Sequence, residues 1–239
     1  MKLIRDKYRD SCRNICLRAI PLFFLLLSFH SLTAQEKLLP AFLDSGLVAY
    51  YPFDGDADDH SGNRNHGIVH GTRLTSDRLG NLRSAYIFER ISDNIRIPKS
   101  SDFDFSDEQA MSLGFWIQEL TNGGEANIDI LITGGGPICM YFTFSTSIML
   151  NRVYTNVHAS ECRIYVKTFI TDSMKKWYYI LSTMDSDFLT LDLDGVMVDR
   201  RSLYDTKWNS VYTSGLLITP NESGPTRAKT VIDDVRIYI

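Results

Sequence analysis

The sequence has few of the residues that build zinc sites and no excess of the charge that binds nucleic acids. Only four of its 239 residues are cysteine, and none form a C-x-x-C pair, which argues against a structural zinc site. Lysine and arginine number 25 against 29 aspartate and glutamate, for a formal charge of −4. Nucleic acids and anionic membranes both favour clustered positive charge. Neither is therefore an expected partner.

Long apolar runs are also missing, since the longest candidate, Ala19–Leu32, is shorter than the roughly 20 residues of a transmembrane helix. It follows a basic stretch from Lys2 to Arg18 and is followed by Thr33-Ala34-Gln35, which offers a small residue to a signal peptidase. We predict a signal peptide at 1–34 and an exported protein that is periplasmic, cell-surface or extracellular, with no membrane span after cleavage. An uncleaved signal anchor is the alternative. Without residues 1–34, which carry six basic and two acidic residues, the formal charge becomes −8.

No segment shows the long apolar stripe of a capped helix. The apolar runs are instead strand-length, rich in β-branched and aromatic residues, and separated by Gly, Asn, Asp, Ser or Pro. Asp194-Gly195 between two such runs is a strong two-residue hairpin signal. Residues 35–239 are therefore predicted to form one all-β domain, an antiparallel two-sheet jelly-roll sandwich. The expected strands are Leu47–Phe53, Ala85–Phe88, Asn94–Ile97, Met111–Gln118, Asp129–Thr133, Ile138–Phe144, Arg163–Phe169, Trp177–Met184, Phe188–Leu193, Val196–Arg200, Leu216–Thr219 and Thr230–Tyr238.

An acidic loop after the first strand is the best candidate site. It offers the hard oxygens of Asp54, Asp56, Asp58, Asp59, Asn63 and Asn65 in a segment bent by three glycines. Ca²⁺ takes 6–8 oxygen ligands of this kind, and Asp233 in the last strand could complete the shell if the terminal strands lie side by side. The alternative is a solvated turn whose Asp and Asn side chains cap their own backbone.

Two cysteines remain outside the predicted signal peptide, Cys139 and Cys162, one in each of two neighbouring predicted strands. In an exported protein such a pair indicates a disulfide. Two buried free thiols are the alternative, because cysteine also packs well as a small apolar residue.

Carbohydrate binding needs an exposed aromatic side chain beside polar groups. Trp116 and Trp177 lie within predicted strands and are expected in the core, where large aromatics bury the most area. Trp208 lies in a loop-like stretch and is therefore the predicted ligand-binding residue. A loop Trp folded back over the core is the alternative.

A glycosidase would need paired carboxylates. Asp192 and Asp194 alternate along one predicted strand, as the acids of retaining glucanases do, but Asp194 precedes Gly195 in the predicted turn and no third acid continues the pattern. The histidines have no nucleophile motif beside them. We therefore predict no catalytic residues and no enzyme.

Several segments, in order, resemble the LamG-like jelly-roll domain of the concanavalin A-like lectin/glucanase superfamily. The two specific ones are Gly46–Gly67 and Ile232–Tyr238, while Asn122–Glu161 fits the pattern poorly. The resemblance points to Asp59, Asn63 and Asp233, with Asp54 beside them, as ligands of a structural Ca²⁺. It implies a non-catalytic recognition module whose partner is a glycan or glycoprotein. A protein–protein adhesion or matrix module is the second hypothesis, and a divergent glycoside hydrolase or polysaccharide lyase is the third.

Overall fold

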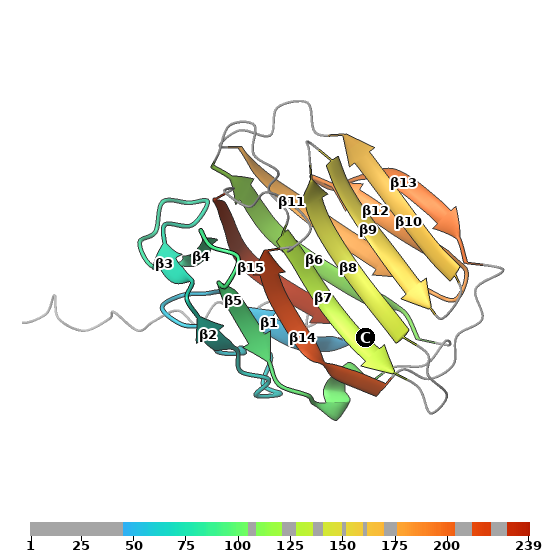
Figure 1. Cartoon of the computed structure of the whole chain (residues 1–239), viewed down its shortest axis with the longest axis horizontal. Coiled ribbons are helices and arrows are strands. Elements are labelled where there is room, and N and C mark those ends of the chain that lie inside the picture. Colours follow the sequence, from blue (N-terminus) through green and yellow to red (C-terminus); the bar gives the residue numbers. More distant parts are fainter. Residues whose placement is uncertain are drawn as a thin grey trace, which may run out of the picture. The chain divides into compact units, whose positions relative to one another are not determined.

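The computed structural model describes residues 45–104, 109–120, 128–135, 141–149, 152–159, 162–169, 176–203, 212–220 and 229–239. These residues form two β-sheets, one of eight strands and one of seven, and every strand pairing is antiparallel. Figure 1 shows the two sheets layered over each other. The predicted all-β, two-sheet sandwich is confirmed. Among the described residues, no helix is long and apolar enough to cross a membrane.

The strands follow a regular order across each sheet. The eight-stranded sheet runs β13 (Val196–Ser202), β12 (Phe188–Leu193), β11 (Trp177–Met184), β6 (Met111–Glu119), β15 (Thr230–Tyr238), β4 (Ala85–Phe88) and β3 (Arg73–Thr75), with β1 (Leu47–Tyr51) also on β15. The seven-stranded sheet runs β10 (Cys162–Phe169), β9 (Arg152–Ala159), β8 (Tyr141–Met149), β7 (Ile128–Gly135), β14 (Tyr212–Pro220), β5 (Asn94–Ile97) and β2 (Ile68–His70). A short 3₁₀ helix, η2 (Ser101–Phe103), follows β5.

The two end segments meet in one sheet. β1 pairs with β15 so that Tyr50 lies opposite Arg236 and Tyr51 opposite Val235, and β6 pairs with the other edge of β15. The first and last strands therefore lie side by side, as the calcium hypothesis required. This pairing brings residues from the two ends of the domain to one surface.

Alternation along the strands separates a core face from an outer face. In β6, Met111, Leu113, Phe115 and Ile117 are buried in the main core, and in β11 Ile180 and Met184 join them. The residues between them, including Trp116 and Tyr179, lie on the opposite, outer face of the eight-stranded sheet and are half-buried. The outer face therefore carries large side chains that the core does not enclose.

Three strands were missed by the sequence prediction. β2 and β3 have only three residues each and no buried residue, so they lack the alternation that marks a half-buried strand. β9 lies in the segment that fits the sequence pattern poorly. β8 and β14 also begin or end several residues from the predicted bounds.

The acidic loop covers the outer edge of β1, and Asp59 holds it there. One carboxylate oxygen of Asp59 accepts hydrogen bonds from the backbone N–H groups of Tyr50 and Ser61, each at 2.9 Å. The other accepts from the Ser61 hydroxyl and the Asn65 N–H, also at 2.9 Å. Asp59 is buried. A saturated, buried carboxylate of this kind fixes the loop rather than offering oxygens to solvent.

A bulge in β1 completes this cover. The register with β15 shifts between Leu47 and Ala49, and the Val48 carbonyl accepts hydrogen bonds from the side chains of Ser61, Asn63 and Asn65 at 3.1, 2.9 and 3.3 Å. The polar residues of the loop thus satisfy an edge strand that would otherwise expose its backbone groups.

Replacement of Asp59 by alanine should destabilise the domain by about 3 kcal/mol, because four donors lose a charged acceptor and the buried ones are left unpaired. Urea unfolding followed by tryptophan fluorescence measures the change. Asp54→Ala is the matched control, since Asp54 is exposed in the same loop, and should change stability little. Equal effects of the two variants would contradict the role assigned to Asp59.

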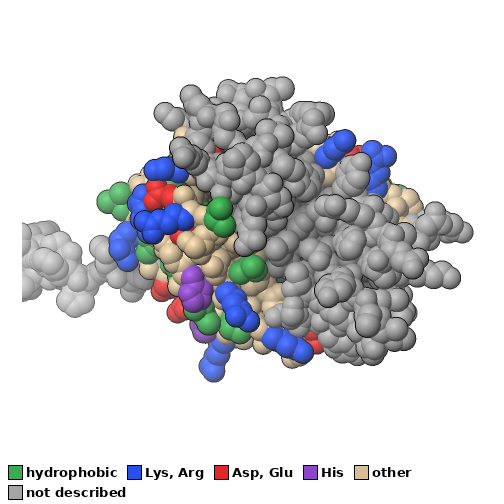
Figure 2. All heavy atoms as spheres, in the orientation of Figure 1, with side chains coloured by type: hydrophobic (Ala, Val, Ile, Leu, Met, Phe, Trp, Pro, Cys, Tyr) green, Lys and Arg blue, Asp and Glu red, His purple; other side chains and the backbone are tan. Residues whose placement is uncertain are grey.

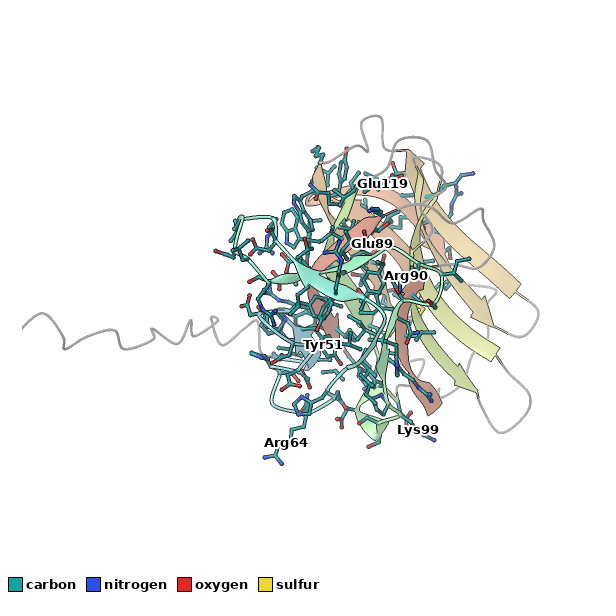
Figure 3. All side chains as sticks on the ribbon, turned by 60° about the vertical axis from the view of Figure 1, so that its left-hand side comes forward. Tyr51, Arg64, Glu89, Arg90, Lys99 and Glu119 are labelled. Atoms are coloured by element: carbon teal, nitrogen blue, oxygen red, sulfur yellow. The ribbon has the colours of Figure 1, made fainter. Side chains whose placement is uncertain are left out.

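Glu119 ends β6 on the same face as Ile117 and is buried (Figure 3). Burial raises the pKa of this carboxyl from 4.5 to about 7. Between these values the unfolded chain has already lost the proton that the folded chain still holds. The contribution of Glu119 to stability should therefore fall as pH rises from 4.5 to about 7, by about 3 kcal/mol.

Glu119→Gln should remove this contribution and leave that of Asp233, whose pKa burial also raises to about 7. The variant should therefore be more stable than the parent above pH 7 and about equal to it near pH 4.5. Melting temperatures over this pH range test the expectation. Asp187→Asn, at an exposed acid, serves as the control. An unchanged pH profile in Glu119→Gln would rule out Glu119 as the cause.

Candidate functional site

The outer face of the eight-stranded sheet carries a pair of aromatic rings. Trp116 of β6 lies opposite Tyr179 of β11, with ring centroids 5.3 Å apart and planes tilted by 48°. Gly114 lies two residues before Trp116 on the same face, and a Cβ atom there would overlap the Tyr179 hydroxyl. Glycine at this position therefore lets the tyrosine side chain reach across β6. The two rings form a partly exposed aromatic surface, and burial raises the pKa of Tyr179.

A third ring and a cation adjoin this pair. Tyr50 of β1 lies opposite Arg236 of β15, whose guanidinium carbon is 4.6 Å from the centre of the tyrosine ring. Arg236 in turn lies opposite Gly114 in the pairing of β15 with β6. The terminal strands thus contribute a cation–π pair directly beside the rings of β6 and β11.

Arg78 connects a loop to this surface. It belongs to residues 76–84, which join β3 to β4, and its guanidinium lies 4.9 Å from the centre of the Trp116 ring. Its Nη1 donates to Asp233 Oδ2, and its Nη2 donates to Asp234 Oδ2 at 3.1 Å. Arg236 Nη2 lies 2.9 Å from the other oxygen of Asp234. Two guanidinium groups and two carboxylates therefore alternate along the edge of the aromatic surface.

A bulge in β15 makes this arrangement possible. Successive residues of a regular strand point to opposite faces, but the register with β6 shifts between Asp233 and Arg236, and Asp234 has φ = 55°. The irregularity allows both carboxylates to reach the same guanidinium. Burial raises the pKa of Asp233 to about 7, while the charge of Arg78 acts in the opposite direction.

The loop that carries Arg78 is itself tightly bonded. Asp77 accepts hydrogen bonds from the N–H groups of Leu79 and Asn81, each at 2.8 Å, and from the Asn81 side chain. Leu79 and Leu82 nevertheless remain 74% and 81% exposed. The loop therefore presents two apolar side chains to solvent from a well-ordered turn.

Figure 2 shows that the surface near β3, β4 and β5 mixes charges with apolar groups. Arg73 and Lys229 both pair with Glu89, through contacts of 2.8 and 2.7 Å. Ile91, close to Glu89 in the sequence, is 46% exposed. Between Arg73 and Ile97, five arginines stand against three acidic residues, so basic side chains outnumber acidic ones on this side of the domain.

The four predicted calcium ligands do not fit one ion in this arrangement. Both oxygens of Asp59 are saturated by hydrogen bonds, the Asn63 amide donates to β1, and Asp233 is paired with Arg78. Asp54 is exposed. Among the residues with described side chains, no group of three or more His, Cys, Asp or Glu could hold a metal ion. Calcium binding stays a prediction without support from this geometry.

Other predicted site residues fall in parts of the chain that are not described. Trp208 and Cys139 lie outside the described residues, and for Cys162 only the backbone, at the start of β10, is described. The predicted disulfide and the predicted binding role of Trp208 therefore stay predictions.

The expectation that Trp116 and Trp177 belong to the core is confirmed only in part. Trp116 lies half-buried on the outer face, whereas Trp177, also half-buried there, packs against a second hydrophobic core cluster of Ala85, Ile87 and Val231. Within β6 and β11 the alternation itself could have revealed this, because Trp116 and Tyr179 alternate with the most apolar residues.

Nothing in the sequence pointed to Arg78, whose partners lie 155 and 156 residues away.

Among the acidic residues with described side chains, Asp233 and Asp234 come together, but both are bonded to Arg78. Glu119 lies on the core side of the sheet and Asp233 lies opposite Trp116 on the outer side. Asp194 lies in the β12–β13 turn, where it accepts a hydrogen bond from the Tyr179 N–H at 2.8 Å, while Asp192 is still within β12. These positions do not match two acids that flank one glycosidic bond at about 5–5.5 Å from each other.

Solved structures with the same fold include the binding domains of a mosquitocidal protein and of botulinum neurotoxins. The binding domain of Paraclostridial mosquitocidal protein 1 is 17% identical, with a TM-score of 0.65, and the match covers 82% of this chain and 49% of that one. The binding domain of botulinum neurotoxin serotype D is 12% identical, with a TM-score of 0.64 and coverage of 83% and 48%. The binding domain of botulinum neurotoxin DC, solved in complex with rat synaptotagmin II, is 13% identical, with a TM-score of 0.63 and coverage of 82% and 48%.

The chain spans about half the length of these structures, and at such identities the likeness concerns the fold alone. No curated protein sequence matches the chain. A family model, described as the concanavalin A-like lectin/glucanases superfamily, matches residues 90–239, which is well over half of the sequence. Together with the two antiparallel sheets, this match shows that the chain belongs to the concanavalin A-like lectin/glucanase superfamily.

Proposed function

We propose that the protein is an exported, non-catalytic recognition module that binds a glycan or glycoprotein. The observation that carries the proposal is the Trp116–Tyr179 ring pair, half-buried on the outer face of the eight-stranded sheet. Trp116 and Tyr179 replace Trp208 as the candidate ligand-binding residues in this proposal, because their surroundings are described and support the role.

The chemistry around the rings suits a sugar. One face of a hexose is largely apolar and stacks on an aromatic ring, while its hydroxyl groups need both donors and acceptors. Arg236 and Arg78 supply donors beside the rings, and Asp234 supplies acceptor oxygens. Because each of these arginines is paired with a carboxylate, the surface offers hydrogen bonds without a strong net charge. It therefore favours hydroxyl-rich ligands over strongly anionic ones.

The similar structures support a binding role. Each is described as a binding domain, and one was solved in complex with rat synaptotagmin II. The match covers about half of each of those binding domains. Their shared fold supports recognition as the common use of this sandwich, and the ligand of the present chain is our inference from its own surface.

We assign no catalytic step to the domain, although its superfamily also includes glucanases. Two acids working on one bond must lie on the same side of a sheet, and Glu119 and Asp233 lie on opposite sides. Asp234 does lie on the side of Asp233, but both of these carboxylates are bonded to Arg78. Export through the predicted signal peptide and a Cys139–Cys162 disulfide are part of the same proposal, since both suit a domain that acts outside the cytoplasm.

A protein–protein adhesion module is the second candidate, and the exposed leucines favour it. Leu79 and Leu82 project from the ordered loop of Arg78, close to a surface rich in Trp, Tyr and Arg. These three residue types are enriched among the residues that dominate protein interfaces. An adhesion module would use the leucines together with the rings, whereas a glycan would use the rings alone.

Trp116→Ala and Tyr179→Ala should each weaken binding to the glycan or glycoprotein partner by about thirtyfold, as truncation of a central aromatic contact costs about 2 kcal/mol. A polysaccharide and glycan array identifies the ligand, and calorimetry with that ligand gives the affinities. Thermal melting of each variant confirms that it is folded.

Leu79→Ser/Leu82→Ser is the matched variant, because it changes exposed side chains of the adjoining loop without touching the rings. It should leave glycan binding unchanged. If folded protein binds nothing on the array, or if only the leucine variant loses binding, the proposal of glycan binding is contradicted and an adhesion module is favoured. Release of modified sugars on incubation would contradict the non-catalytic assignment.

A further inference from the structure

The carboxylate that the sequence resemblance gives to calcium is held by an arginine in the structure. The Asp233 side chain is 3% exposed and bonds to Arg78 Nη1, while Asp234, 12% exposed, bonds to Arg78 Nη2 at 3.1 Å. The planar guanidinium thus contacts two carboxylates at once through separate N–H groups. We infer that Arg78 is an internal cation that occupies the position predicted for calcium on β15, so that the fold of this domain does not depend on a metal ion.

The backbone of β15 places two carboxylates where a single planar guanidinium can bond to both. The bulge between Asp233 and Arg236, with Asp234 at φ = 55°, turns consecutive carboxylates toward one group. A positive φ is an unfavourable conformation for aspartate and persists only where surrounding contacts hold it. The hydrogen bond from Arg78 to Asp234 and the ion pair between Arg236 and Asp234 are such contacts.

Asp59, a predicted calcium ligand in the acidic loop, has no free oxygen lone pair for a metal ion. Each oxygen of Asp59 already accepts two hydrogen bonds, so both lone pairs of each oxygen are used. A calcium ion would have to displace the Tyr50 and Asn65 N–H groups, which would then need new acceptors. The acidic loop is therefore stable through its own hydrogen bonds.

The charges on β15 are balanced without a metal. Asp233 and Asp234 face the guanidinium groups of Arg78 and Arg236, and the open face of Arg78 lies over the Trp116 ring. A divalent ion added here would meet two cations within the same cluster. The arginine also performs the structural task of a bridging ion, because it ties residues 76–84 to the last strand.

The test uses the full chain in excess chelator and in millimolar calcium. The parent protein should melt at the same temperature in both and should bind no Tb³⁺, a luminescent probe of calcium sites. A melting temperature that falls in chelator, or Tb³⁺ emission from the parent protein, would overturn the inference.

Arg78→Ala should lower the melting temperature by about 5–10 °C, because it leaves buried carboxylates without their cation. It should also create a response that the parent lacks, in which calcium raises the melting temperature and bound Tb³⁺ is sensitised by the neighbouring Trp116. Arg90→Ala, at an exposed arginine near β5, is the matched control and should do neither.

Arg78→Lys keeps the test valid if Arg78→Ala does not fold. Lysine retains the positive charge but cannot bond to both carboxylates as a planar fork. This variant should melt below the parent and still show no calcium response. If both Arg78 variants melt like the parent, Arg78 is not the cation that the fold requires.

Discussion

The pairing of the first and last strands is the constraint on which the rest of the described structure depends. β15 is bordered by β6 along one edge and by β1 and β4 along the other, so it is the central strand of its sheet. Its core-facing residues, Ile232, Val235 and Ile237, are fully or almost fully buried. Since β1 and β15 come from opposite ends of the domain, their pairing closes the sheet only when nearly all of the chain is in position. The contact therefore carries the high loop-closure cost typical of β-sandwiches.

The same strand also organises the outer face. Its bulge directs Asp233 and Asp234 to Arg78, and the residue that follows in register, Arg236, lies against Tyr50. Because Arg78 also lies over Trp116, a loop, two terminal strands and the aromatic pair are joined through one guanidinium. Such a surface is largely set before a ligand arrives, and a preformed surface loses little conformational entropy on binding.

The sequence predicted the architecture better than the site, and particular residues show why. The strand-length apolar runs of β6, β11 and β12 and the Asp194-Gly195 turn are local signals, and each appears in the structure close to where it was expected. The pairing of β1 with β15 entered the sequence analysis only as a condition of the calcium hypothesis. The partner of Asp233 could not be derived locally, because Arg78 is 155 residues distant and carries no pattern of its own. The acidic loop resembled a cation site because the sequence does not show whether the oxygens of an aspartate already accept hydrogen bonds from the protein.

The contrast between Asp59 and Asp233 explains how the domain uses buried charge. Asp59 is stabilised by backbone and hydroxyl donors and fixes a loop on an edge strand, so its role is complete within the fold. Asp233 is stabilised by Arg78, whose side chain extends over the ring of Trp116, so Asp233 also helps to position groups that a ligand could contact. A carboxylate held by backbone groups cannot be released without local unfolding, whereas one held by a half-exposed arginine responds to whatever approaches that arginine. The chemistry that a ligand would meet on this domain is therefore concentrated around Arg78 and its ring neighbours, and not in the more acidic loop.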